Sequence, residues 1–451
     1  MSQPGEGKRA APFVTGSIMR HVVVMTLTGA VGLMALFMVD LVDLFFLSLL
    51  DNTEVTAAIG YAGTIVFSNL SVSIGCGIAA AALVARNVGA GDQARAREFA
   101  TSALMFSLIT SALITLAINL GSGALLSLLG ATGEAKRQAQ LFIWTLSPGY
   151  VLIAGAICCS FILRGLGDAR RAMYITLSTA LVTACADPVF IFGLGLGIQG
   201  AAAATVLGYV VSFGIGLHGV VRVHRYINPF RLRGLGRDFP ALWAIAFPAI
   251  LTQLAQPFAN AYITHGIAPF GDESVAGFAI VGRLIPVAFG IIFSLAGSVG
   301  PIIGQNYGAR RHDRVRRTLI DGLIFSAVYT LATSLLLFLF RHQLAEAFNA
   351  AGRSRDLVVF FCTFIGISWA FAGGQFVANA AFNNLGRAAL SSWFNWGKAT
   401  LGTIPFAMLG AQLGGPEGLL AGTAIGSVIF GIASVVTAFR IVGQSERGAA
   451  R

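Results

Sequence analysis

Long apolar segments alternate with short polar connections along the whole chain of 451 residues. An α-helix needs about 20 apolar residues to cross the hydrocarbon core of a bilayer, and the segments meet that length. The pattern therefore predicts an all-α membrane protein with twelve transmembrane helices. The twelve segments cover residues 18–49, 55–85, 98–121, 139–163, 171–193, 199–222, 240–268, 275–305, 318–340, 357–383, 389–411 and 418–440.

The composition supports this prediction and excludes two other classes of protein. Hydrophobic residues make up 56% of the chain and charged residues 11%, whereas about 25% of the residues of an ordinary soluble domain are charged. Such a chain cannot hide its apolar surface in water, so it is neither a soluble enzyme nor a nucleic-acid binder. All five cysteines lie inside apolar segments without the spacing of a zinc site, so we expect no disulfide framework and no metal.

The distribution of basic residues predicts the orientation of the helices. Of the 30 lysines and arginines, 23 lie at the N-terminus, in alternate connections and at the C-terminus, and only five lie in the opposite connections. The positive-inside rule therefore places both termini in the cytoplasm of a cell whose inner membrane the chain spans. The first segment is too long for a signal-peptide core, so we expect it to be retained as a helix. Two cations, Arg283 and Lys398, remain inside apolar segments.

The second half of the chain repeats the first at a nearly constant spacing. The repeat pairs Asn87-Val88-Gly89-Ala90 with Asn306-Tyr307-Gly308-Ala309, and Gly167 with Gly386. The repeating unit contains six helices, and because six is even, both units enter the membrane in the same direction. We predict two six-helix lobes related by a parallel repeat, with a cleft between them that opens alternately to each side. The predicted lobes are residues 1–222 and 240–451, joined by a basic cytoplasmic linker, residues 223–239.

Carboxylates inside the apolar segments are few, and they favour the first lobe. An ionisable group in hydrocarbon costs at least about 2.5 to 3.5 kcal/mol on insertion scales, so its presence indicates function. Asp40 and Asp43 lie in the first segment and Asp187 in the fifth, whereas Asp321 lies near the start of the ninth and reads as an interfacial charge. The repeat aligns the first three with neutral residues of the second lobe: Ala259, Tyr262, and Pro405 or Phe406. We therefore predict that ion coupling belongs to the first lobe.

Helix geometry places neutral polar groups beside these acids. Asp40 and Asp43 are three residues apart, and Thr183 and Asp187 are four apart, so each pair lies near one helix face. Pro188 follows Asp187 and cannot bond the carbonyl of Ala184, which leaves an acceptor beside the carboxylate. A desolvated carboxylate in such surroundings is a plausible proton carrier.

Several motifs, in order along nearly the whole chain, resemble the multidrug and toxic compound extrusion (MATE) family. The first segment carries Leu41-Val42-Asp43-Leu44-Phe45, which is similar to the acidic motif of the family's first helix. The motifs at helix ends and turns are Arg86-Asn87-Val88-Gly89-Ala90-Gly91-Asp92, Leu163-Arg164-Gly165-Leu166-Gly167-Asp168, Gln305-Asn306-Tyr307-Gly308-Ala309 and Asn384-Leu385-Gly386-Arg387. The most specific match is Asp187-Pro188-Val189-Phe190-Ile191-Phe192 with the following Gly197-Ile198-Gln199-Gly200-Ala201-Ala202.

The resemblance implies efflux of organic cations or amphipathic drugs in exchange for protons or sodium. It assigns ion-coupling roles to Asp43, Asp187 and Thr205, with Thr183 standing where the family usually has Asn and with Asp40 as a further candidate. The first helix has Gly29 where a family proline is familiar, so a proline-driven bend is not expected. No acid occurs between Asp356 and Glu417, which favours the DinF-like branch over the NorM-like branch.

We expect a mostly apolar and aromatic substrate surface with neutral polar groups, because broad specificity requires adaptable contacts. The candidate substrate-binding residues are Met34, Phe37, Tyr61, Asn69, Gln253, Gln256 and Asn260. The expected partners are cationic or amphipathic drugs and membrane lipids, and we expect a monomer with no cofactor and no nucleic-acid partner. Protons are favoured as the coupling ion, with sodium as the alternative.

Three other interpretations fit the sequence less well. A flippase of the same superfamily for lipid-linked sugars is the closest rival, although twelve helices and first-lobe carboxylates favour cation export. An embedded enzyme would need a nucleophile with a base or a metal cluster, and the six histidines are scattered. The dinucleotide fingerprint Gly195-Leu196-Gly197-Ile198-Gln199-Gly200 lacks the acidic residue that should follow it and lies between two membrane spans, so we interpret it as a turn.

Overall fold

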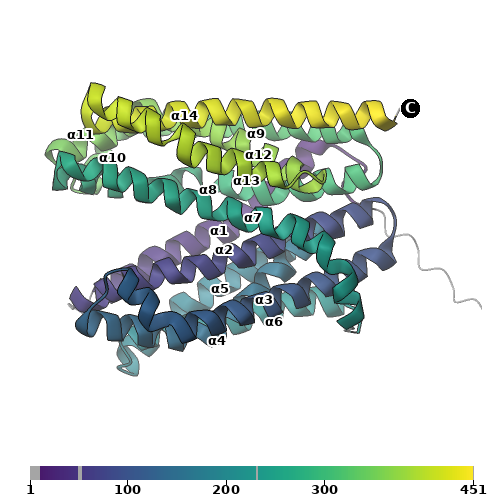
Figure 1. Cartoon of the computed structure of the whole chain (residues 1–451), viewed down its shortest axis with the longest axis horizontal. Coiled ribbons are helices and arrows are strands. Elements are labelled where there is room, and N and C mark those ends of the chain that lie inside the picture. Colours follow the sequence, from purple (N-terminus) through teal and green to yellow (C-terminus); the bar gives the residue numbers. More distant parts are fainter. Residues whose placement is uncertain (1–10, 49–52, 230–231, 450–451) are drawn as a thin grey trace, which may run out of the picture. The chain divides into compact units, whose positions relative to one another are not determined.

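The described part of the chain, residues 11–48, 53–229 and 232–449 of a computed structural model, consists of helices and connections without a strand. Figure 1 shows the helices in chain order, from purple at the N-terminus to yellow at the C-terminus. The α-helices are α1 (Ile18–Ser48), α2 (Thr53–Gly89), α3 (Gln93–Leu128), α4 (Gly133–Gly165), α5 (Ala169–Pro188), α6 (Ile198–His218), α7 (Leu232–Ile267), α8 (Asp272–Gly308), α9 (His312–Leu339), α10 (Arg341–Ala347), α11 (Gly352–Phe360), α12 (Trp369–Asn384), α13 (Ala389–Gly397) and α14 (Ile404–Ala449). Short π-helical turns continue four of them: Val189–Gly193, Gly219–Val223, Phe361–Ile365 and Lys398–Gly402.

Eleven helical runs in the described residues are long and apolar enough to cross a membrane, and the last of them contains two crossings. This run, Ala389–Arg447, has 59 residues. A straight helix of that length would extend about 90 Å, roughly three times the hydrocarbon core. The helical backbone is interrupted at Gly414 and Gly415, and Gly415 adopts φ +61°, which glycine tolerates without strain. The fold is therefore the predicted all-α arrangement of twelve transmembrane helices.

The chain forms two compact units, each with its own core. One unit contains Met1–Ala30, Ala85–Asp92 and Leu251–Arg451, and we call it the second unit; the first unit contains Val31–Val84 and Gln93–Ile250. Helices α1 and α7 each pass from one unit into the other, after Ala30 and after Ile250, and these two points correspond under the repeat to within one residue. The predicted lobe and linker boundaries, at residues 222, 239 and 240, stay a prediction.

Within the first unit, neighbouring helices pack through small residues. Helices α3, α4, α5 and α6 lie side by side (Figure 1). Gly208 of α6 lies so close to α5 that an added methyl group would be 2.6 Å from the hydroxyl oxygen of Thr183. Tight contact through small residues is usual between membrane helices. Lipid tails are as apolar as leucine, so a helix prefers another helix to lipid only where the two helices pack closely.

The same packing recurs between the last two crossings of the second unit. Gly418, Gly422 and Gly426 follow one another at intervals of four, and a methyl group on any of them would overlap a backbone carbonyl oxygen of the preceding crossing. Gly422 lies against Phe406 and Gly426 against Gly402. Under the repeat, Gly426 corresponds to Gly208 at a shift of 218 and Gly402 to Thr183 at a shift of 219, so glycine mediates a close contact at similar positions in both pairs. The spacing of the contacts differs by a residue between the two pairs of helices, so the alignment of Asp187 with Pro405 or Phe406 stays open.

The ends of α2 and α8 form a further pair of contacts within the second unit. Gly89 lies against the carbonyl of Gln305, and Gly308 lies against the carbonyl of Arg86. The repeat pairs Gly89 with Gly308 and Arg86 with Gln305, so it converts each contact into the other. The two helix ends are therefore related by a local two-fold axis. The guanidinium of Arg86 also lies over the ring of Tyr307, 5.1 Å from its centre.

At the start of α5, Asp168 joins three segments of the first unit. Its carboxylate accepts a hydrogen bond from the backbone N–H of Arg171 at 3.1 Å and forms an ion pair with the Arg171 guanidinium at 2.5 Å. The His224 ring nitrogen Nε2 lies 2.8 Å from the same carboxylate. Asp168 thus caps α5 and connects it to the segment that follows α6.

We expect Asp168→Asn to lower the free energy of unfolding at pH 7 by about 1 kcal/mol. The effect is no larger because solvent screens the interaction with the exposed Arg171. Burial alone would raise the pKa of Asp168, but hydrogen bonds from His224 and Arg171 outweigh burial and hold that pKa below its usual range. Because the folded-state pKa is depressed, this stabilisation is present above about pH 4 and is lost as the pH falls below it. Melting curves of both proteins in detergent should therefore converge under acid conditions; a constant difference would contradict this account.

Candidate functional site

Asp43 of α1 and Asp187 of α5 are brought together in the first unit. Their carboxyl groups lie within hydrogen-bonding reach of each other. The two residues are far apart in the chain. The sequence predicted a coupling role for each of them, but it did not predict that they contact each other. Two ionised carboxylates at such a separation repel each other, so the contact is favourable only when a proton lies between them.

The surroundings of this pair contain no fixed positive charge among the described residues. Asp187 is fully buried, and neither of its oxygens accepts a hydrogen bond from a described N–H or hydroxyl group. One oxygen of Asp43 likewise accepts no hydrogen bond from a described N–H or hydroxyl group. Buried carboxylates normally have several such partners, so this pair differs from a structural hydrogen-bonded contact. A proton is the group that satisfies both side chains.

Thr183 completes the group one turn before Asp187. Its hydroxyl is buried, makes no hydrogen bond with a described group, and faces Gly208 of α6. A threonine hydroxyl can both donate and accept, so it can follow a change in the protonation of the neighbouring carboxyl. The close approach of Gly208 leaves no room for a larger side chain at that point.

Helix α5 ends immediately after the acid. Pro188 is the last residue of α5, and the π-helical turn Val189–Gly193 follows it. The proline has no N–H, and the N–H of Val189 bonds the carbonyl of Ala186 instead of continuing the regular ladder. Local π-helical geometry of this kind often marks functional positions, because it leaves backbone groups available.

The other two ion-coupling candidates are not joined to this pair by any described contact. Thr205 of α6 is half-buried, and its hydroxyl donates to the carbonyl of Ala201 in its own helix at 3.0 Å. Asp40 belongs to α1, but its side chain lies outside the described part of the chain. The coupling roles of both residues stay predictions.

The first-unit candidates for substrate binding have different surroundings. Met34 and Phe37 are half-buried in α1, and Tyr61 packs against a small apolar cluster formed by α2, α3, α4 and the start of α6. Asn69 is 1% exposed, and its amide nitrogen lies 3.4 Å from the hydroxyl of Thr115 in α3. The structure thus places Asn69 between helices, and its substrate-binding role stays a prediction.

The second-unit candidates lie on α7, where Gln256 and Asn260 are exposed and Gln253 is half-buried. The Gln256 amide donates to the side-chain oxygen of Asn260 at 3.0 Å, one helical turn away. Exposed amides are costly in lipid, so they indicate a polar or water-accessible face of α7. Arg283 of α8 is also exposed, although it was not among the predicted site residues. Its position inside an apolar segment set it apart in the sequence.

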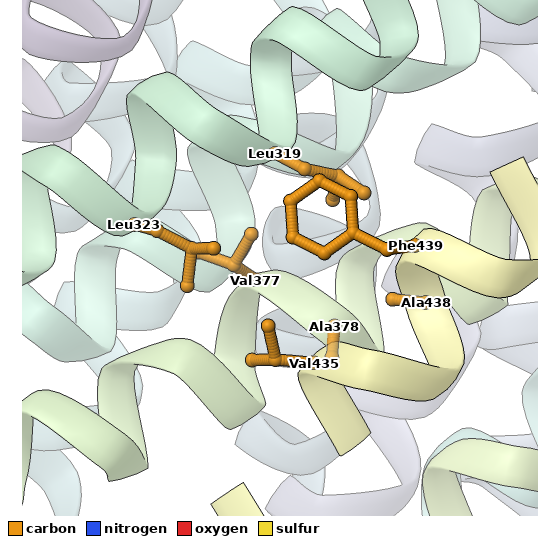
Figure 2. Close-up of a pocket in the computed structure, with 7 residues that line it drawn as sticks. All are labelled: Leu319, Leu323, Val377, Ala378, Val435, Ala438 and Phe439. Carbon is orange, nitrogen blue, oxygen red and sulfur yellow. The ribbon is translucent and has the colours of Figure 1, made fainter. Parts of the chain in front are cut away.

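The described residues hold no cluster of three or more His, Cys, Asp or Glu side chains that could bind a metal. A small hollow in the second unit lies between α9, α12 and α14 (Figure 2). Its lining is purely apolar: Leu319, Leu323, Val377, Ala378, Val435, Ala438 and Phe439. Without a polar group it cannot orient a drug or hold an ion, so it is a packing feature of these three helices.

Comparisons with known proteins place this geometry in a family. The chain is 29% identical to a FAD transporter of Shewanella oneidensis over 92% of this chain and 93% of the relative. It is 23% identical to a probable multidrug resistance protein, NorM, of Thermotoga maritima over 70% and 69% of the two chains.

Solved structures agree with the fold. A crystal structure of the MATE transporter VcmN of Vibrio cholerae superposes with a TM-score of 0.90 at 25% identity, covering 96% of this chain and 97% of that chain. An outward-facing multidrug resistance MATE family transporter superposes with a TM-score of 0.90 at 22% identity, covering 99% and 100%.

The MatE family model matches residues 30–189 and 248–409. The starts of the two matched segments correspond under the internal repeat to within one residue, and so do their ends. Together the segments cover well over half of the chain, and the protein therefore belongs to the MATE family of transporters.

Proposed function

We propose that this chain is a secondary active antiporter that exports organic cations and amphipathic drugs in exchange for protons by alternating access. The observation that carries this proposal is the contact between the carboxyl groups of Asp43 and Asp187. The pair has no described cationic partner, so its net charge changes whenever a proton binds or leaves. Such a group can link proton movement to the binding of a charged substrate.

The direction of coupling follows from this charge. When both carboxylates are ionised, the pair attracts a cation and the two acids repel each other. A proton that arrives from outside removes the repulsion, draws Asp43 toward Asp187, and lowers the affinity for the cation, which leaves outward. Loss of the proton to the inside restores the attractive state. Because Asp43 belongs to α1 and Asp187 to α5, each cycle changes the contact between these two helices.

The finer features of the proposal come from the sequence. The protein spans a bacterial inner membrane, with both termini and the basic connections on the cytoplasmic side. It works as a monomer and belongs to the DinF-like branch. Thr183 and Thr205 supply neutral polar groups, and Asp40 lies one turn from Asp43 in the same helix. In the second unit, Pro405 or Phe406 takes the place of Asp187, so that unit supplies substrate contacts and no coupling acid.

We expect purified protein in liposomes to move protons when a cationic drug is supplied, with no requirement for sodium. The measurement uses a pH-sensitive dye inside the vesicles, with sodium present and with sodium replaced by choline. Drug transport that depends on sodium and moves no protons would contradict the proposal and would support the sodium-coupled alternative. Movement of a lipid-linked sugar without drug transport would instead support the flippase.

A second candidate substrate comes from the relative named as a FAD transporter. FAD carries a negatively charged pyrophosphate, so its export requires positive groups in the membrane-spanning part. Arg283 of α8 and Lys398 of the π-helical turn Lys398–Gly402 are such groups, and both belong to the second unit. This observation favours a substrate range that includes anionic compounds.

A further inference from the structure

Arg283 is an exposed cation and the twelfth of the 37 residues of the membrane-spanning helix α8. It belongs to α8 (Asp272–Gly308), in which the acidic residues, Asp272 and Glu273, lie in the first turn. Within the described part of the chain, the Arg283 guanidinium forms no ion pair and no hydrogen bond. An arginine at this depth costs about 2.5 to 3.5 kcal/mol on insertion scales when it faces lipid. The side chain therefore needs a polar or water-filled space.

The side of α8 that carries Arg283 is not packed against the core of the second unit. The neighbouring positions Val281 and Leu284 are 1% and 5% exposed and belong to the apolar core of the second unit. Gly282 and Arg283 lie on the other side of the helix and are exposed. A methyl group added at Gly282 would meet no atom within 4 Å, so no other element packs against this side of α8 at Gly282.

Polar groups of α7 lie at the same depth. Helices α7 and α8 pack in one core, where Ile263 and Ile267 join Val281 and Leu284. Helices α7 and α8 are joined by the short turn Ala268–Phe270. Gln256 lies 12 residues before this turn and Arg283 lies 13 residues after it. At about 1.5 Å per residue, both lie about 18 Å from the turn, close to the middle of a core that is about 30 Å thick. The amides of Gln256 and Asn260 are exposed on this part of α7.

The positive charge in this part of the second unit is not compensated by acids among the described residues. Lys398 is half-buried, and the adjacent Ala399 packs against Ala255 and Ala259 of α7, which places Lys398 near the level of Gln256. Asp321 of α9 forms its own ion pair with Arg317 at 2.8 Å. The repeat aligns Arg283 with Thr64 in the sequence, so the arginine is particular to the second half.

We infer that Arg283 binds the anionic group, a phosphate or a carboxylate, of amphipathic compounds that the transporter carries, and that Gln256 and Asn260 orient the same compound by hydrogen bonds. The guanidinium presents parallel N–H donors that match two oxygens of a phosphate or carboxylate, and this pairing is stronger in a site with little water. The inference rests on the proposed export function and names a substrate class for it. The substrates then include organic anions and zwitterions in addition to cations.

The experiment compares pairs of ligands with and without an anionic group, using the purified full-length protein in lipid nanodiscs. The probes are riboflavin 5′-phosphate against riboflavin, a fluoroquinolone carboxylic acid against its methyl ester, and ethidium as a cation. Arg283→Gln should weaken binding of the two anionic compounds on the order of tenfold, which corresponds to about 1.4 kcal/mol, and should leave the other three within about twofold. Arg283→Lys should keep part of the preference, because it retains the charge without the bidentate geometry.

Arg440→Gln is the matched control, because it removes an exposed arginine from the same unit. Arg440 lies near the end of the last crossing, about 37 Å along the helix from Gly415 and beyond the hydrocarbon core. We expect it to bind all five probes as the unmodified protein does. Equal losses for all five probes in Arg283→Gln, or equal binding of both members of each pair by the unmodified protein, would overturn the inference.

Two further comparisons separate this inference from others. Binding in nanodiscs needs no ion gradient, so a failure of proton coupling in liposomes leaves the binding result intact, and the two proposals can fail independently. A polyprenyl-pyrophosphate-linked sugar serves as competitor for riboflavin 5′-phosphate. If that lipid binds through Arg283 and the soluble anions do not, the anionic group belongs to a lipid donor and the assignment to soluble compounds is wrong.

Discussion

Asp187→Asn and Asp43→Asn should each reduce gradient-driven drug export to the level of protein-free liposomes while the protein inserts and folds normally. Asparagine preserves the size of the side chain but cannot exchange a proton, so the pair loses its change of charge. The amide can still donate a hydrogen bond to the remaining carboxylate, which keeps α1 and α5 in contact. The measurement is uptake of a fluorescent cation into liposomes that contain the purified protein, under an imposed pH gradient, with expression and monodispersity checked on the same protein.

The pair predicts a non-additive result. Because the two carboxyl groups contact each other and share one function, the double variant should bind drug with the same residual pH dependence as either single variant. Drug binding to Asp187→Asn in detergent should also lose most of the pH dependence shown by the unmodified protein.

Asp321→Asn is the control within the second unit. Asp321 is 2% exposed and is paired with Arg317 four residues earlier. Its replacement should lower stability without removing the pH-dependent step, so export per folded molecule should stay near normal. Near-normal export by either Asp43→Asn or Asp187→Asn would show that the first-unit carboxylates are not the coupling groups, and Asp40, Lys398 or a sodium site would have to replace them.

The sequence was sufficient to predict the number of crossings and the repeat. Each crossing is a long apolar run, and the length of such a run is set by the bilayer and not by the details of packing. The repeat was visible in glycines at helix ends, since Gly89 and Gly308 are constrained by contacts that no larger residue allows. The alignment of Asp187 stays open between Pro405 and Phe406, because the glycine contacts in the two pairs of helices do not share one shift.

The faces of the helices could not be predicted in the same way. In a membrane protein both the core and the lipid are apolar, so periodicity does not separate a buried side from a lipid-facing side. Asn69 and Gln256 therefore look alike in the sequence, although the first is buried between helices and the second is exposed. Likewise, the contact of Asp43 with Asp187 depends on how α1 packs against α5, and nothing local to either helix encodes it.

Gly89→Ala and Gly308→Ala should each lower stability by about 1 to 3 kcal/mol and strongly reduce export, although each adds only one methyl group. At both positions the added carbon would overlap the backbone carbonyl oxygen of the opposing helix end, of Gln305 and of Arg86 respectively. Ordinary carbon–oxygen contacts between backbones lie at about 3.3 to 3.6 Å, and a backbone oxygen cannot rotate away as a side chain can. The ends of α2 and α8 must therefore separate, and Arg86 loses its position over Tyr307.

Gly443→Ala separates this effect from the general consequence of replacing a helical glycine. A methyl group at Gly443, near the end of α14, would meet no atom within 4 Å. Alanine favours the helical backbone over glycine by up to about 1 kcal/mol, so this variant should be as stable as the unmodified protein or slightly more so. Melting temperatures in detergent and export in the same vesicles measure both effects. Because the repeat exchanges the contacts of Gly89 and Gly308, their variants should behave alike; a large loss in one and none in the other would contradict the two-fold crossing.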